Sequence, residues 1–120
     1  MKGKFRLDEK FEAVSYDSLF ISEITLAELK FGVAKSAAVE KNTLVLRDFL
    51  SGIQVLPIFD ALDVYAKEKA RLQKEGNPVD DFDLLIGATA ISNELTLVTN
   101  NIKHFERLTN IRIENWAIEV

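Results

Sequence analysis

Apolar residues recur along the chain with two periods that alternate from segment to segment. Four short segments are rich in β-branched or aromatic residues and are bounded by turn residues, as strands are. These candidate strands are residues 17–25, 52–58, 95–100 and 110–116. The segments between them carry apolar residues three and four positions apart, which predicts helices. The candidate helices are residues 26–36, 39–52, 61–76 and a segment that begins at Asp83.

A helix follows most of these strands, and such alternation is typical of βαβ units with a parallel sheet. We therefore expect an α/β fold, a three-layer α/β/α domain with a mainly parallel sheet of about four strands. The length of 120 residues fits one domain, which we place at residues 1–120. No Pro/Gly-rich linker or internal repeat divides it.

Local signals mark the ends of some helices. Asp60 is placed to cap the helix of residues 61–76, and Gly76 is placed to end it. Thr25 and Glu28 have the S/T-x-x-E spacing of a capping box, which is one explanation of Glu28.

The composition excludes several classes of protein and of metal site. No apolar run reaches the roughly 18 residues of a membrane helix, and the N-terminus lacks the apolar segment of a signal peptide, so we expect a cytoplasmic protein that spans no membrane. With no cysteine and one histidine, His104, any metal must be bound mainly by oxygen atoms. The net charge of −4 argues against coating nucleic acid by bulk charge, although local basic patches remain open.

Three features gather at the predicted carboxyl ends of the strands, where open parallel sheets place their sites. Glu28 lies in the helix after the first strand. Asp83 precedes the apolar run LLIGATAI, where an acid also complements the helix dipole. Gly87 and Ala90 follow Asp83 at i+4 and i+7 and leave a stripe of small residues that another backbone can approach. The third feature, LVTNN, ends a strand in hydrogen-bonding side chains.

The order and spacing of ISEITLAELKFGV, VLPI, DLLIGATAI, LTLVTNNIKHF and IRIENW resemble the PIN-domain ribonucleases, and within them the VapC-type toxins of toxin–antitoxin pairs. The resemblance covers about 100 residues. It implies carboxylates gathered around Mg²⁺ or Mn²⁺ and hydrolysis of an RNA phosphodiester bond. By motif, Glu28 and Asp83 match two of the acids, and both are expected to be catalytic and to bind the metal.

The chain also departs from this family pattern. The family begins with a strand of the form LLDTN, whose aspartate binds the metal, and we expect this strand and the first helix to be absent here. Asp8 does not replace that aspartate, because it lies in an amphipathic helix pattern without a preceding strand. Where relatives carry a fourth acid, this chain has Asn101 and His104. The expected metal ligands are therefore Glu28, Asp83 and Asp81, which predicts weak binding of Mg²⁺ or Mn²⁺.

Thr99, Asn101 and His104 are expected to form the second shell of hydrogen-bonding groups around these ligands. Without a central strand the sheet would keep two unpaired edges. The place of the missing strand could be filled in four ways: by a rearranged N-terminal segment, by an exchange of segments between chains, by a partner, or by residues encoded upstream of Met1.

The resemblance implies RNA as the substrate, a cognate antitoxin as the partner, and a homodimer. The helix of residues 61–76 offers four apolar side chains for pairing, which alternatively pack on the domain's own sheet. They are Val64, Tyr65, Ala66 and Leu72. Two functions of different class compete: an endoribonuclease toxin whose activity is impaired or lost, and a non-catalytic PIN remnant that binds antitoxin or dimerises. A plain α/β interaction domain is a third possibility.

Overall fold

The computed structural model describes residues 20–99 and 101–115. The elements in chain order are β1 (Phe20–Ser22), α2 (Glu23–Ala34), α3 (Val39–Leu50), β2 (Gln54–Leu56), the 3₁₀ turn η1 (Phe59–Ala61), α4 (Leu62–Lys74), α5 (Asp81–Ser92), β3 (Leu97–Val98), α6 (Ile102–Phe105) and β4 (Ile113–Glu114). Each predicted strand and helix that falls in these ranges is present, although the strands are shorter than predicted. The predicted strand ends at residues 17–19, 100 and 116 lie outside the described residues. No described helix has the length and apolar character needed to cross a membrane.

Both strand pairs are parallel, which confirms the predicted α/β class. Strand β1 pairs with β2 in the register Ile21 to Val55, and β3 pairs with β4 in the register Leu97 to Ile113. Within residues 20–99 and 101–115 these are two separate two-stranded sheets, not one sheet of four strands. The sequence pattern identifies which segments are strands, but it does not determine which strands are neighbours.

Helix α2 begins three residues earlier than the sequence predicted. Ser22 is its N-cap, and the Ser22 hydroxyl accepts a hydrogen bond from the backbone N–H of Thr25 at 3.1 Å. The capping box of Thr25 and Glu28 is therefore wrong, because Thr25 already lies inside the helix. Glu28 is in the second turn, where its carboxylate is too far along the helix to cap its start.

The two end signals of the helix predicted at residues 61–76 have different outcomes. Asp60 lies within η1, and the N-cap of α4 is Ala61, so the predicted capping role of Asp60 is wrong. Gly76 does end the helix: it has φ +72°, and Asn77 donates to the Leu72 carbonyl while Gly76 donates to the Gln73 carbonyl. This pair of hydrogen bonds is a Schellman motif, which requires the left-handed conformation that glycine adopts without strain.

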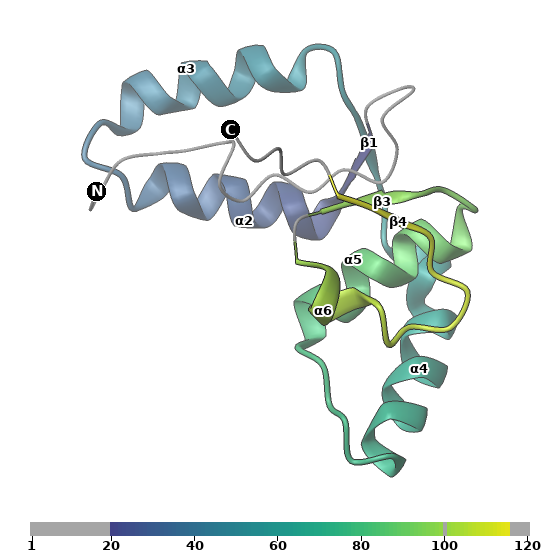
Figure 1. Cartoon of the computed structure of the whole chain (residues 1–120). Coiled ribbons are helices and arrows are strands. Elements are labelled where there is room, and N and C mark those ends of the chain that lie inside the picture. The colour runs from purple at the N-terminus through teal and green to yellow at the C-terminus, as the bar shows by residue number, and fades with distance from the viewer. Residues whose placement is uncertain (1–19, 100, 116–120) are drawn as a thin grey trace.

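Helix α5 lies at the centre of the packing. Six of its 12 residues are buried, and it packs against α2, η1, α4 and α6. Figure 1 shows α5 between α4 and α6, while α2 and α3 form a helical hairpin that extends away from them. The larger core cluster surrounds α5 and contains Leu56, Leu72, Leu84, Ile86, Ala90, Leu97, Phe105 and Leu108. The smaller cluster joins β1, α2 and α3 through Ile21, Leu29, Val33 and Leu46.

The apolar residues of α4 are only partly available for pairing with a second copy. Leu72 is 1% exposed in the larger core cluster, and Tyr65 packs against the same cluster. For these two residues the structure favours the alternative that they pack within their own domain, and it contradicts Leu72 as a dimer contact. Val64 is half-buried and Ala66 is exposed.

A carboxylate on α4 binds the segment that follows α6. Glu68 is buried, and its Oε1 accepts hydrogen bonds from the Thr109 backbone N–H at 2.7 Å and from Arg71 Nη2 at 2.9 Å. Arg71 Nη2 also donates to the carbonyl oxygen of Arg107 at 2.7 Å. The pair Glu68 and Arg71, called the α4 clamp below, thus holds residues 107–109 against α4, although the bonded residues are 36 and 41 positions apart in sequence.

The small residue Gly87 lets a different part of the same segment approach α5. A Cβ atom added at Gly87 would lie 2.5 Å from Leu108 Cδ1 and 3.5 Å from Phe105 Cδ1. The predicted close approach at this stripe therefore exists, but side chains of α6 and the segment after it make it, not the backbone predicted from the sequence.

We expect Gly87→Ala to destabilise the fold. Alanine gains about 1 kcal/mol of helix propensity over glycine, but forcing a methyl group into a packed core costs about 1–3 kcal/mol. The free energy of unfolding in urea should fall relative to the parent chain, and in a Leu108→Ala background the same substitution should cause no further loss. Gly52→Ala is the control, because a Cβ there has no atom within 4 Å. A Gly87→Ala chain as stable as the parent would contradict this packing.

The α4 clamp also predicts a pH dependence of stability. Burial raises the pKa of Glu68, but hydrogen bonds from Arg71 and Thr109 outweigh it and hold the pKa below the ordinary value of 4.5. The clamp's contribution is therefore complete above pH 4.5 and is lost as the pH falls through the lowered pKa. In Glu68→Gln the unfolding free energy should depend less steeply on pH in that acidic range. An acid profile identical to that of the parent chain would show that the Glu68 carboxylate contributes nothing there.

Candidate functional site

The site is built from the first turn of α5. Asp80 is the N-cap, and its carboxylate accepts hydrogen bonds from the backbone N–H groups of Phe82 and Asp83 at 3.1 and 3.4 Å. Asp83 is thus the third residue of the helix and not its first, as the sequence had suggested. Its side chain is 21% exposed, because the helix that carries it is packed on most sides.

The pKa of Asp83 is raised above its ordinary value. Burial is the largest cause, the contact with His104 opposes it, and the nearby charge of Asp80 adds to it. Asp83 therefore binds a proton more readily than an exposed aspartate does, mainly because it is buried and partly because of the neighbouring Asp80 carboxylate.

His104, from α6, lies directly against Asp83. The distance from His104 Nδ1 to Asp83 Oδ2 is 3.0 Å, and the imidazole is 60% exposed. An ionised carboxylate only accepts hydrogen bonds, so Nδ1 carries the proton in this contact. The structure therefore brings together two site residues that are 21 positions apart in sequence.

Asp81 points to a different part of the molecule. Its Oδ1 lies 2.9 Å from Lys69 Nζ and accepts a hydrogen bond from the Tyr65 hydroxyl at 3.0 Å. The Lys69 hydrogen bond is the main reason why the pKa of Asp81 is lowered. Residues two apart on a helix do not face each other, so Asp81 faces α4 while Asp83 faces α6. A metal-binding role for Asp81 stays a prediction, with this ion pair against it.

The other predicted residues lie on neighbouring elements. Glu28 is half-buried on α2, which packs against α5. Thr99 is buried after β3, and its hydroxyl accepts a hydrogen bond from the Asn101 backbone N–H at 3.0 Å. Asn101 is the exposed N-cap residue of α6. This bond fixes the start of α6, the helix that carries His104.

Oxygen donors at Asp83 and Glu28 are of the type that Mg²⁺ and Mn²⁺ bind. Within the two described ranges, however, no group of three or more acidic or histidine side chains is arranged to hold a metal ion. The described residues therefore fit such an ion only in part. Water, substrate oxygens or other parts of the chain would have to supply the remaining ligands, which agrees with Mg²⁺ keeping several of its waters in protein sites.

Sequence reasoning missed two contributors to this region. Asp80 was not recognised as the cap, although an Asp shortly before an apolar helical run is a usual capping signal. Glu68 and Arg71 were not singled out. Glu68 lies three residues after Tyr65 and four before Leu72, on the apolar stripe of the helix, and an acid on such a stripe indicates a buried partner.

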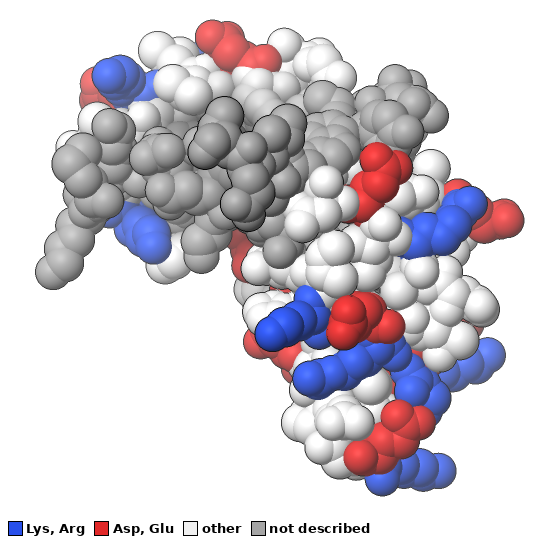
Figure 2. Space-filling view, viewed as in Figure 1, with Lys and Arg blue, Asp and Glu red and all other residues white. Residues whose placement is uncertain are grey.

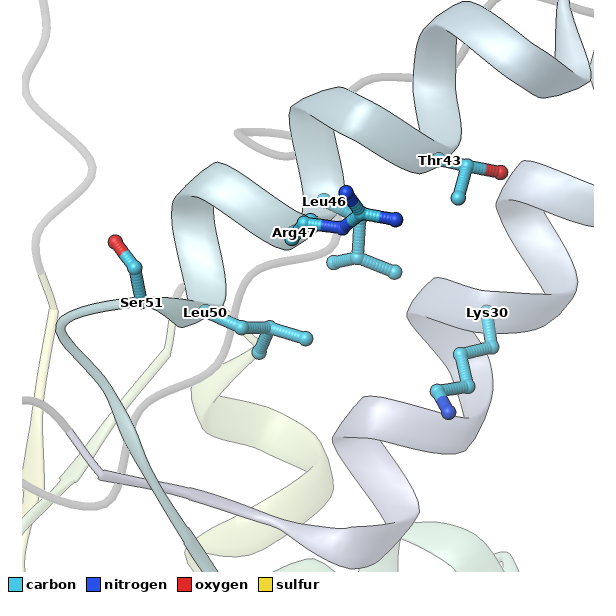
Figure 3. A pocket seen from close by; sticks show the side chains of 6 residues that line it. All are labelled: Lys30, Thr43, Leu46, Arg47, Leu50 and Ser51. Carbon is cyan, nitrogen blue, oxygen red and sulfur yellow. The ribbon is translucent and has the colours of Figure 1, made fainter.

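The surface has two further features. On the face shown in Figure 2, basic and acidic side chains alternate over the part formed by α4, α5 and α6, in keeping with the net charge of −4. An open groove of about 400 Å³ runs between α2 and α3 (Figure 3). Its lining residues are Lys30, Thr43, Leu46, Arg47, Leu50 and Ser51.

Comparison with known proteins places the chain in a family. Residues 3–111 match the family model of the PIN domain. The chain is 41% identical over 98 residues to the tRNA(fMet)-specific endonuclease VapC of Salmonella typhimurium. The matched region covers 81% of this chain and 74% of that protein. The chain is also 41% identical over 101 residues to ribonuclease VapC2 of Rickettsia felis, covering 83% of this chain and 75% of that protein.

Solved structures agree with this assignment. The crystal structure of VapBC2 from Rickettsia felis bound to a promoter DNA fragment matches with a TM-score of 0.78 and 40% identity, over 83% of this chain and 76% of that chain. The DNA-bound VapBC of Salmonella typhimurium matches with a TM-score of 0.78 and 41% identity, over 82% and 75%. The predicted three-layer α/β/α PIN-like fold is confirmed. The chain belongs to the PIN domain family and, within it, to the VapC-type proteins of toxin–antitoxin pairs.

Proposed function

We propose that this protein is a VapC-type endoribonuclease toxin that hydrolyses RNA phosphodiester bonds and is held inactive by a cognate antitoxin. Relatives at about 40% identity that carry the name ribonuclease or endonuclease support the reaction class. The observation in the structure that carries the proposal is the half-buried Asp83 carboxylate, paired with His104 at the start of α5. A half-buried acid with a perturbed pKa is a common mark of an active site.

RNA with a tRNA-like fold is the first substrate to test. Relatives from Salmonella typhimurium and Shigella flexneri are named tRNA(fMet)-specific endonucleases. The alternating charges of the face in Figure 2 do not form a continuous basic surface there. Recognition of a particular RNA shape through a few contacts near Asp83 therefore fits this chain better than binding to any RNA by bulk charge.

The residues of the site have distinct parts in this proposal. Asp83 and Glu28 are the expected metal ligands, and Mg²⁺ or Mn²⁺, when bound, supplies a Lewis acid and an activated water. His104 donates Nδ1–H to Asp83 Oδ2, which fixes the orientation of that carboxylate. Because the imidazole is 60% exposed, its other nitrogen can meet a phosphate oxygen of the RNA.

Thr99 and Asn101 complete this arrangement by holding the start of α6, and with it His104.

Reduced activity of the chain as given stays a prediction, as do weak metal binding, the homodimer and a cytoplasmic location. The antitoxin partner is supported by the VapBC toxin–antitoxin complexes among the similar structures. The groove between α2 and α3 carries the basic residues Lys30 and Arg47 and no acidic residue.

The role of Asp83 is tested by cleavage of tRNA in the presence of Mn²⁺. Asp83→Asn keeps the shape of the side chain and removes its charge, so we expect the cleavage rate to fall by about 100-fold or more, beyond the loss typical of residues that only orient a ligand. Asp81→Asn makes the same chemical change two residues away. Because Asp81 faces Lys69, this control should retain most of the activity.

Two outcomes would overturn parts of this account. If both variants lose activity equally, Asp81 takes part in the site despite its ion pair. If the parent chain shows no metal-dependent cleavage while it still binds a VapB-type antitoxin, the alternative of a non-catalytic PIN remnant is correct.

A further inference from the structure

We propose that Glu68 and Arg71, the α4 clamp, are positioning residues that set the place of His104 against Asp83. This inference rests on the proposed function for its consequence in catalysis. Its structural part, the link between α4 and the His104–Asp83 contact, does not depend on whether the chain cleaves RNA.

The clamp contacts the backbone and not a side chain of the segment after α6. Glu68 Oε1 accepts from the Thr109 N–H at 2.7 Å, and Arg71 Nη2 donates to the Arg107 carbonyl at 2.7 Å. The two clamp residues are also bound to each other, with Arg71 Nη2 and Nε at 2.9 and 3.3 Å from the Glu68 carboxylate. One donor and one acceptor of the segment are therefore fixed together by hydrogen bonds to charged groups, which are shorter and stronger than bonds between neutral groups.

This segment continues directly from the helix that carries His104. Leu108 donates its N–H to the Phe105 carbonyl at 3.0 Å, and Glu106 donates to the Ile102 carbonyl at 2.9 Å. These bonds join residues 107–109 to α6 without a free turn between them. In Figure 1, α6 lies alongside α5, and the segment after α6 runs on toward α4, to which it is hydrogen-bonded. A shift at residue 107 or 109 is thus passed to His104 over a few bonds.

Helix α6 needs restraints beyond its own hydrogen bonds to hold His104 in place, and the bond from the Asn101 N–H to the Thr99 hydroxyl at its start is one of them. It is 4 residues long, and its N-cap side chain makes no capping hydrogen bond. Its anchors in the core are Phe105, which is fully buried, and Leu108, which is 3% exposed. Apolar contacts of this kind hold α6 at a given distance from α5 but restrain its rotation less, because the hydrophobic effect is non-directional. The hydrogen bonds of the clamp supply a directional restraint.

The chain contains a matched control for the clamp. Glu75 is also bound to Arg71, with both carboxylate oxygens 3.1 Å from Arg71 Nη1, but its side chain is 50% exposed. Among the residues that the structure describes, no hydrogen bond or ion pair joins Glu75 to residues 107–109. Glu68→Ala and Glu75→Ala therefore each remove one carboxylate partner of the same arginine on the same helix, and only the first releases the segment after α6.

The experiment follows the ring nitrogens of His104 by NMR in the full chain at one fixed pH. His104 is the single histidine of the sequence, so its signals need no further assignment. Asp83→Asn provides the reference spectrum for an altered contact. We expect Glu68→Ala to move the His104 signals toward that reference, and Glu75→Ala to leave them at the parent position. Glu68→Gln keeps an acceptor for the Thr109 N–H and loses the charge, so it should give an intermediate shift. This variant keeps the test decisive if Glu68→Ala does not fold.

Catalysis provides the second readout. Misplacement of one group by about 1 Å can cost about 100-fold in rate. We expect kcat for RNA cleavage to fall by about 10- to 100-fold in Glu68→Ala with little change in KM, and neither constant to change in Glu75→Ala. His104 signals at the parent position in folded Glu68→Ala and Glu68→Gln would overturn the inference. If the parent chain cleaves no RNA, the proposed function fails, and the NMR comparison still decides whether the clamp positions His104.

Discussion

The burial of α5 is the constraint on which the rest of the structure depends. This helix is apolar on most of its surface, so α2, η1, α4 and α6 all have to pack against it. Its core residues Leu84 and Ile86 are no more than 1% exposed. Burying side chains of that size contributes about 1.5–3 kcal/mol each. The start of such a helix is where a charge can reach solvent while the surrounding protein still limits its hydration, and Asp83 occupies that position.

Close packing on α5 also determines how the site is completed. Gly87 lacks a side chain, and Leu108 and Phe105 fill that space, which brings α6 against the helix. His104, next to Phe105, then meets the carboxylate of Asp83, one turn before Gly87 on α5. The apolar contacts hold α6 against α5, and the α4 clamp restrains the segment that follows α6, as proposed above. Stability and the proposed chemistry thus depend on the same few contacts.

The sequence predicted the elements well because their signals are local. The apolar run after Asp83 and the left-handed Gly76 are each read within a few residues, and both have the predicted place in the structure. Helix starts were predicted less well: Ser22 and Asp80 compete with other capping residues close by, and only the backbone conformation decides between them. The pairing of strands was not predictable in detail, because it depends on contacts between distant segments.

The candidate site was predicted in part for the same reason. Asp83 and His104 were both identified, but their 3.0 Å contact depends on how α6 packs on α5. Asp81 has the same residue type as Asp83 and differs only in the face of the helix on which it lies. The clamp was missed because neither Arg71 nor Glu68 has a partner nearby in sequence that reveals the bond to residues 107–109.

The central claim, that Asp83 is the centre of a metal-dependent site, is tested most directly by adding Mn²⁺ while recording the NMR signals of His104. A paramagnetic ion broadens the signals of the atoms nearest to it. Our account predicts that the His104 ring signals broaden first in the parent chain, at low Mn²⁺ concentration, and that Asp83→Asn abolishes this preference. Broadening that begins elsewhere in the chain, or that is unchanged in Asp83→Asn, would contradict it.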